Sequence, residues 1–192
     1  MLAWTTDLIQ ILVLLMASIC LFFFVVTRGA LIARALSSGD QSEKSHVYPV
    51  YSDMRLIKLV DFQPLISAIL LFQYHRLVAK IIAGLKQSDL SGKKVLITSC
   101  AFGNVIPEVV KAAIEAGADR VVIADIIHNE LVHAKGKLGD YAERVDFIED
   151  NATEMKQKDG VVAANVIFFL LHELPHHLKA PAIREAGRLL SP

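Results

Sequence analysis

The chain has 192 residues, of which 20 are basic and 20 acidic, so its formal net charge is zero and no basic excess points to nucleic acid. This length suits one domain of ordinary size with an appendage. The two cysteines, Cys20 in an apolar segment and Cys100 much further on, do not suggest a disulfide framework.

The N-terminal part, residues 1–36, reads as a membrane anchor. Leu8–Thr27 is uncharged and apolar, and about twenty helical residues span the roughly 30 Å of a bilayer's hydrocarbon core. Asp7 precedes the run, which does not fit the basic start of a signal peptide, although a buried core helix is an alternative. Basic residues follow it at 28, 34 and 44, so we expect a single-pass protein whose C-terminal bulk lies on the cytoplasmic or matrix side.

Residues 37–46 form a polar connector, and residues 47–192 form the expected domain. Leu56–Leu85 is apolar with helical spacing and is interrupted by Pro64. We predict two helices, with Pro64 in the first turn of the second. Such helices could cover a pocket for an apolar, membrane-dissolved substrate, or could simply pack in the core.

A strand–loop–helix–strand unit follows. Val95–Thr98 is a short β-branched run of the kind found in buried parallel strands. Gly103 then allows a turn, and the apolar positions between Asn104 and Gly117 recur at helical spacing. A second apolar run ends at Asp125.

This unit predicts a nucleoside site. Asp125 lies about twenty positions after the glycine loop, where a carboxylate can accept hydrogen bonds from ribose hydroxyls. The alternative is that Asp125 is only a polar residue at a strand end. Ser99 and Ala101 replace loop glycines that a dinucleotide pyrophosphate needs for close backbone approach, which argues against NAD.

Further strands and helices complete an α/β pattern. We expect a helix over Glu130–Leu138, a third strand over Val145–Ile148, a fourth over Val161–Leu170 and a last helix over His176–Leu190. Asn151, after the third strand, could bond an adenine edge.

The stretch His172–His176 matches the H-E-x-x-H pattern of zinc peptidases. That chemistry needs one continuous helix, and Pro175 inside the required turn would cost about 3 kcal/mol. As residues at the end of the fourth strand, His172 and Glu173 could instead act as acid, base or cation ligand in the same crevice as Asp125. They could also merely cap the last helix.

The layout resembles the class I S-adenosylmethionine-dependent methyltransferases, whose loop glycine, ribose acid and adenine residue match Gly103, Asp125 and Asn151. The segments VLITSCAFG, LVDFQPLISAILLFQYHRL and FFLLHELP are similar, more narrowly, to the rhodoquinone-biosynthesis members of that superfamily. Those members have an altered first loop with a cysteine at the Cys100 position. The resemblance covers roughly residues 48–192.

The resemblance implies a Rossmann-like methyltransferase fold, a parallel sheet with flanking helices that would lack its fifth to seventh strands in this chain. It implies S-adenosylmethionine as cofactor, with backbone cradling the methionine part, Asp125 the ribose and Asn151 the adenine. His172 and Glu173 would be catalytic and face the quinone, assisted by a divalent metal such as Mn²⁺ for which no ligands are assigned. The expected cofactor-binding residues are Ser99, Cys100, Ala101, Gly103, Asp125, Ile126, Asn151 and Ala152.

The expected function is therefore conversion of ubiquinone to rhodoquinone, in which the amino group of S-adenosylmethionine replaces a ring methoxy group. The partners would be the lipid bilayer and a quinone, with no nucleic acid. A conventional methyltransferase acting on a quinone or lipid, a membrane zinc peptidase and a non-catalytic tethered protein are the alternatives. Cys100 is expected to be a packed residue rather than a nucleophile.

Overall fold

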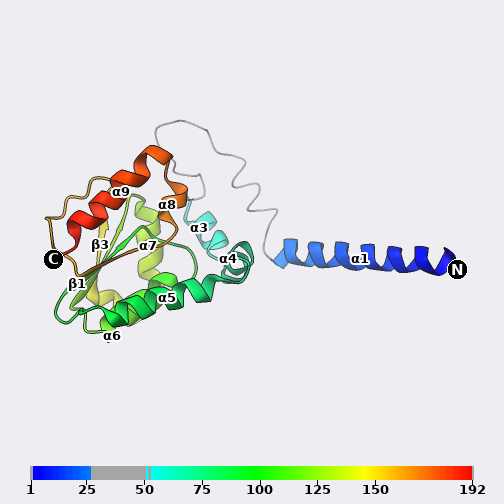
Figure 1. The fold of residues 1–192 in the computed structure, drawn as a ribbon, viewed down its shortest axis with the longest axis horizontal. Helices are drawn as coiled ribbons and strands as arrows, with labels where there is room; N and C mark the ends of the chain where they lie inside the picture. The colour runs from blue at the N-terminus through cyan, green and yellow to red at the C-terminus, as the bar shows by residue number, and fades with distance from the viewer. Residues whose placement is uncertain (1, 27–50, 52, 192) are drawn as a thin grey trace.

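The structure is a computed structural model that describes residues 2–26, 51 and 53–191. The predicted connector, residues 37–46, and the basic residues predicted to orient the anchor lie outside the described residues. The first helix, α1 (Leu2–Val26), lies to one side of an α/β body that contains all the other elements (Figure 1).

Between residue 53 and the first strand the structure describes three helices, where two were predicted. They are α3 (Met54–Val60), α4 (Gln63–Ile69) and α5 (Tyr74–Gln87). Pro64 lies in the first turn of its helix, as predicted. The prediction of one continuous helix after Pro64 was wrong, because Leu71 and Phe72 separate α4 from α5. Their φ angles are 48° and 59°, which a right-handed helix cannot accommodate.

In the described part of the chain, no single helix is both long and apolar enough to cross a bilayer. The apolar stretch Asp7–Phe22 of α1 falls short, and α4 with α5 qualifies only as a pair bent by 93°. The membrane anchor therefore stays a prediction.

Four parallel strands form one sheet in the order β3-β2-β1-β4. They are β1 (Lys94–Thr98), β2 (Arg120–Asp125), β3 (Val145–Glu149) and β4 (Ala164–Ile167). The fourth is shorter than predicted, because Phe169 has a left-handed φ of 65° that ends the extended backbone.

The remaining helices connect and follow these strands. They are α6 (Val105–Glu115), α7 (His128–Gly136), the 3₁₀ helix η2 (Gly139–Arg144), α8 (Leu170–Glu173) and α9 (His176–Leu189). The short α8 was not predicted, whereas α6, α7 and α9 were expected within two residues of their observed bounds.

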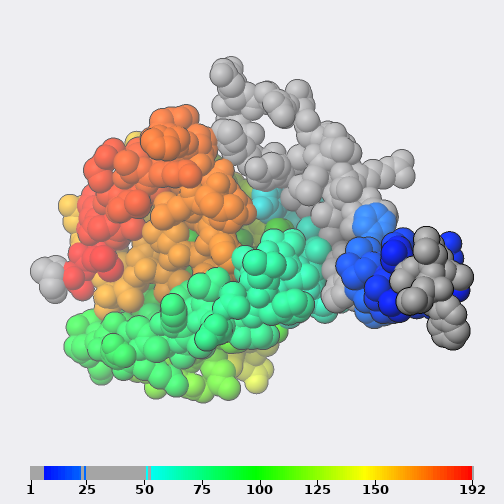
Figure 2. Space-filling model, turned by 45° about the vertical axis from the view of Figure 1, so that its right-hand side comes forward, coloured from blue at the N-terminus to red at the C-terminus, as the bar shows by residue number. Residues whose placement is uncertain are grey.

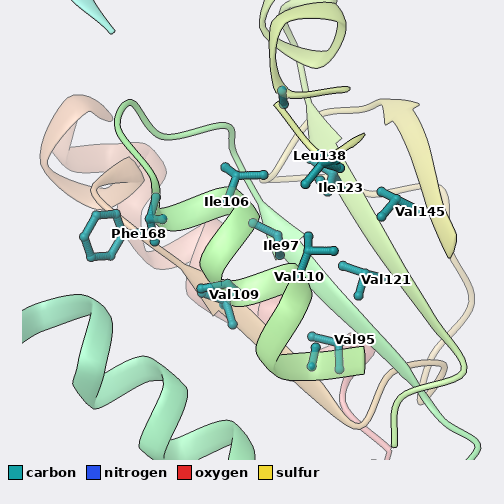
Figure 3. Close-up of a cluster of buried hydrophobic side chains, with 14 of the residues drawn as sticks. Val95, Ile97, Ile106, Val109, Val110, Val121, Ile123, Leu138, Val145 and Phe168 are labelled. Atoms are coloured by element: carbon teal, nitrogen blue, oxygen red, sulfur yellow. The ribbon is translucent and has the colours of Figure 1, made fainter. Parts of the chain in front are cut away.

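The sheet is buried on both faces, which explains its apolar strands. Val95, Ile97, Val121 and Ile123 pack against α6, whose apolar stripe includes Ile106, Val109 and Val110 (Figure 3). The alternate residues Leu96 and Ala124 face the other way and meet Leu189 of α9. Because successive strand residues point to opposite faces, a continuous apolar run is what a doubly covered sheet requires.

Parallel pairing brings the carboxyl ends of the strands to one edge of the sheet. Thr98 pairs with Ala124 and Ile167, and Asp125 pairs with Glu149. The segments that follow the four strands therefore meet at this edge, where open α/β sheets bind ligands.

Candidate cofactor and substrate site

A cavity of about 290 Å³ lies at this edge, and we call it the acidic cavity. Four carboxyl residues line it, namely Asp125, Glu130, Asp150 and Glu173, whereas none of its described lining residues is Lys or Arg. Its wall comes from the segments after β1, β2 and β3 and from α8 and α9. The predicted cofactor residues on it are Ser99, Cys100, Asp125, Ile126, Asn151 and Ala152.

Asp125 ties the first two strand ends together. Its carboxylate accepts hydrogen bonds from the backbone N–H of Cys100 at 2.6 Å and of Ile127 at 2.8 Å. The side chain is buried, and burial raises the pKa of its carboxyl despite these hydrogen bonds. The Ser99 side chain and the Ile126 amide also hydrogen-bond this carboxylate. Because a carboxylate has about four lone-pair sites, a ligand's hydroxyls would replace some of these bonds.

The first loop departs from a glycine-rich one at Ser99. This residue has φ of 75°, a left-handed conformation that glycine adopts without strain and serine does not. Ser99 therefore occupies a position whose backbone conformation favours glycine. It also lines the acidic cavity.

The backbone amides at the start of α6 already donate hydrogen bonds to side chains of the protein. The N–H of Gly103 donates to the carboxylate of Asp61, that of Asn104 to Gln63 Oε1 at 3.2 Å, and that of Val105 to the hydroxyl of Tyr74 at 2.6 Å. A pyrophosphate at a helix N-terminus needs such amides. The geometry thus agrees with the sequence argument against a dinucleotide.

Gly103 lines neither of the cavities described here. A Cβ atom on it would lie 2.6 Å from the hydroxyl oxygen of Tyr74 and 2.7 Å from Gln63 Oε1. Its carbonyl accepts from Lys137 Nζ at 2.9 Å, and Lys137 also donates to Asp61 at 2.7 Å. The glycine therefore serves close packing of the loop, and its predicted cofactor role stays a prediction.

The loop after β3 is held by its own polar groups. Asn151 Oδ1 accepts from the amide of Thr153 at 3.0 Å and from its hydroxyl at 2.9 Å. The buried Asp150 accepts from the amides of Asn151 and Lys156. Asn151 and Ala152 line the acidic cavity, and the adenine contact predicted for Asn151 stays a prediction.

The sequence analysis missed Glu130 and Tyr51. Glu130 is only 2% exposed, and its Oε1 is buried with no hydrogen-bond partner. Burial, reinforced by the nearby charge of Asp125, raises the pKa of its carboxyl to about 8. Tyr51 donates to the Glu173 carboxylate at 3.3 Å. An acid in a helix's first turn and a lone tyrosine carry no sequence signal that marks a site.

A second cavity, of about 550 Å³, adjoins the first, and we call it the apolar cavity. The two share the five lining residues Tyr51, Ser99, Cys100, Leu170 and Glu173. The predicted residues Ala101 and His172 line only the apolar cavity. Its apolar wall consists of Ile66, Ile69, Leu70, Phe102, Phe168 and Phe169.

The HELPH stretch is divided between two helices. His172 and Glu173 belong to α8, Pro175 is the N-cap of α9, and His176 starts α9. The two imidazoles therefore do not project from one helix, as zinc peptidase chemistry requires. Within the described residues, no three His, Cys, Asp or Glu side chains are grouped to hold a metal.

Cys100 lies between the two cavities. Burial and the neighbouring carboxylate of Asp125 raise the pKa of its thiol well above the ordinary value. The thiol therefore stays protonated, which fits the predicted packed residue rather than a nucleophile.

Several solved structures share this fold. PigF with SAH matches with a TM-score of 0.56 and 15% identity over 88% of this chain and 48% of that one. A putative S-adenosylmethionine-dependent methyltransferase from Methanococcus maripaludis matches with 0.53 and 14% over 80% and 64%. The magnesium protoporphyrin IX methyltransferase of Synechocystis PCC 6803, with bound SAH, matches with 0.50 and 16% over 87% and 65%.

The chain thus spans between about half and two thirds of the length of these structures. Their likeness confirms the predicted Rossmann-like methyltransferase fold. No curated protein matches the chain. The family model of the ubiE/COQ5 methyltransferases matches residues 47–192, most of the chain. The chain therefore belongs to the ubiE/COQ5 methyltransferase family, within the class I S-adenosylmethionine-dependent superfamily.

Proposed function

We propose that this chain binds S-adenosylmethionine in the acidic cavity and uses it to modify a membrane quinone held in the apolar cavity. The observation that carries the proposal is the junction of the two cavities, one acidic and one apolar, at Ser99, Cys100 and Glu173. A cofactor and a substrate in these cavities would meet at that junction.

The lining of the acidic cavity fits the cofactor. S-adenosylmethionine carries positive charge at its sulfonium and ammonium groups, and the described lining of the cavity has four carboxyl residues and no lysine or arginine. Asp125 offers acceptor sites for the ribose hydroxyls, and Asn151 and Ala152 offer an edge for adenine. The unpartnered oxygen of Glu130 is a further acceptor in a buried place.

The apolar cavity fits a quinone ring better than a polar substrate, since aromatic and aliphatic side chains make up most of its wall. Tyr51, Cys100, His172 and Glu173 are the titratable residues of its lining, and burial raises the pKa of the Glu173 carboxyl. Of these, His172 and Glu173 were predicted to be catalytic. They are the groups we propose to exchange protons with the substrate.

The finer proposal is amino transfer that converts ubiquinone to rhodoquinone, and it draws support from the resemblance of the altered loop with Cys100. Methyl transfer to a quinone or lipid is the second candidate, favoured by membership of the ubiE/COQ5 family. The described residues group no ligands for a divalent metal, so the residues present do not fit one and neither proposal includes a metal step.

We also propose that α1 anchors the protein in a membrane as a single pass, with the α/β domain on the cytoplasmic or matrix side. The described side chains along α1 are exposed and largely apolar, which supports this placement. Protease protection of the α/β domain in sealed vesicles from cells would test the orientation.

Labelled cofactor distinguishes the two transfers. The full chain in quinone-containing vesicles is given S-adenosylmethionine with ¹⁵N in its amino group and ¹⁴C in its methyl group. Amino transfer predicts a quinone that gains ¹⁵N and no ¹⁴C, whereas methyl transfer predicts the reverse. A quinone carrying neither label would contradict both proposals for this chain.

A further inference from the structure

The turn between α4 and α5, residues 69–73, is the most apolar exposed feature of the α/β body, and we call it the elbow. Ile69 is 68% exposed, Leu71 78% and Phe72 68%. Other exposed large apolar residues of the described body, such as Val132, Val161 and Ile183, are scattered singly. Single exposed apolar residues need no explanation, but three within four positions do.

The backbone holds this apolar tip outward against its own preference. Leu71 and Phe72 are successive left-handed residues, and neither is Gly, Asn or Asp. Their amides bond to the carbonyls of Ala68 and Ser67 at 3.1 and 2.7 Å and so close the end of α4, but the left-handed conformation remains costly for these residue types. The teal surface that includes α4 and the elbow faces the viewer in Figure 2.

The chain segment that contains the elbow carries charge of one sign. Residues 63–88, which comprise α4, the elbow and α5, contain no Asp or Glu but include Arg76, Lys80 and Lys86. Arg76 is exposed one turn after the elbow and donates to Gln73 at 3.1 Å. An apolar tip with a basic flank suits the interface of an anionic bilayer, where apolar side chains enter the acyl region and cations meet headgroups.

The elbow also forms part of the wall of the apolar cavity, to which Ile66, Ile69 and Leu70 contribute. A molecule that leaves the acyl region beside the elbow would therefore reach the cavity without crossing water. In addition, α4 and α5 are bent by 93° relative to each other, so the elbow is the corner between them.

We propose that the elbow enters the surface of an anionic lipid bilayer and admits the apolar substrate to its cavity directly from the membrane. The second part of this proposal, entry of the substrate from the membrane, rests on the proposed function. The occupant of the exposed tip is thus lipid, rather than a second copy of the chain or another protein.

Depth-dependent quenching tests the contact. The full chain with Trp4→Phe, which removes the only tryptophan, receives Phe72→Trp and is placed in phosphatidylcholine–phosphatidylglycerol vesicles whose acyl chains are brominated. We expect blue-shifted emission and quenching several-fold stronger than that of the matched variant Ile183→Trp, which is 54% exposed on α9. Omitting phosphatidylglycerol should weaken the quenching.

Equal quenching of the two variants would overturn the proposal. Blue-shifted emission that bromine does not quench, and that grows with protein concentration in detergent, would assign the elbow to a second copy instead. Quenching requires no turnover, so it is read separately from the labelled-quinone assay. Quenching without labelled product would contradict the function alone, and product without quenching would contradict the elbow contact alone.

Discussion

The loop after β1 and the elbow between α4 and α5 are both irregular segments with left-handed residues, yet they differ in how they are held. Four side chains fix the first loop through its amides: Asp61, Gln63, Tyr74 and Asp125. The elbow's amides bond instead to nearby backbone carbonyls of α4 and of the turn itself, and its side chains Ile69, Leu71 and Phe72 are exposed. The difference separates a loop that distant side chains hold in place, beside the proposed cofactor cavity, from a turn whose apolar side chains have room for an external contact.

The largest expected effect concerns Asp61, whose side chain is only 5% exposed and meets His133 Nε2 at 2.5 Å and Lys137 Nζ at 2.7 Å. Asp61→Ala leaves these groups and the Gly103 amide without their acceptor. We expect the free energy of unfolding to fall by about 3–5 kcal/mol, measured by urea denaturation of the full chain in detergent.

The matched control is Asp146→Ala, because Asp146 pairs with Arg120 at 2.6 Å on the surface. Exposed pairs contribute roughly 0–1 kcal/mol. Similar losses of unfolding free energy in both variants would show that the bonds of Asp61 stabilise the first loop no more than an exposed ion pair does. The contrast with the elbow would then be removed.

The next effect is the pH dependence that Glu130 imposes on stability. Its pKa is raised from 4.5 to about 8 in the folded chain, so the folded state binds more protons than the unfolded state between these values. The free energy of unfolding from this group therefore falls as pH rises through that window. Asp125, Asp61 and Glu173 face Glu130 as acids, and Lys137 faces it as a base.

Glu130→Gln should remove this slope. Relative to the unsubstituted protein, the variant should gain stability progressively from about pH 4.5 to about pH 8, by a few kcal/mol at the upper end. Urea denaturation across this range measures the difference. A constant difference at all pH values would mean that Glu130 is not a proton-binding group of the folded cavity.

A moderate effect is expected for Gly103→Ala. The new Cβ would meet the Tyr74 hydroxyl oxygen at 2.6 Å, and the residue has φ of 80°. We expect a loss of roughly 1–3 kcal/mol, seen in the same denaturation assay. Gly84→Ala in α5 is the control, since nothing lies within 4 Å of its Cβ and the helix favours alanine.

The smallest expected effect is a gain. Ser99→Gly relieves the left-handed serine, which costs roughly 1–2 kcal/mol, but adds about 0.5–1 kcal/mol of backbone entropy in the unfolded chain. We expect a net stabilisation below about 1 kcal/mol in thermal denaturation. A clear destabilisation would mean that the serine side chain supports the first loop.

Local patterns in the sequence were enough to predict the strands and the helices that cover them. Continuous apolar runs predicted strands buried on both faces, and Pro64, Asn104 and Gly117 marked helix ends correctly. The approach of Ser99, Cys100, Asp125 and Asn151 to one cavity also followed, because parallel strands bring their carboxyl ends together.

The remainder depends on contacts between distant residues. The elbow broke a predicted helix through the conformations of Leu71 and Phe72, for which no Gly or Pro gave warning. Asp61 acts across 42 residues on Gly103, and Tyr51 across 122 residues on Glu173. Sequence patterns such as helical or strand periodicity do not predict contacts between residues so far apart in the chain.

The central claim is that the acidic cavity binds S-adenosylmethionine through Asp125. Isothermal titration of the full chain with S-adenosylmethionine should show binding, and Asp125→Ala should weaken it by roughly tenfold or more, as loss of about 1.4 kcal/mol or more implies. Glu149→Ala, at the exposed end of the neighbouring strand, should leave the affinity unchanged. Equal affinity of the Asp125→Ala variant and the unsubstituted protein would contradict the account.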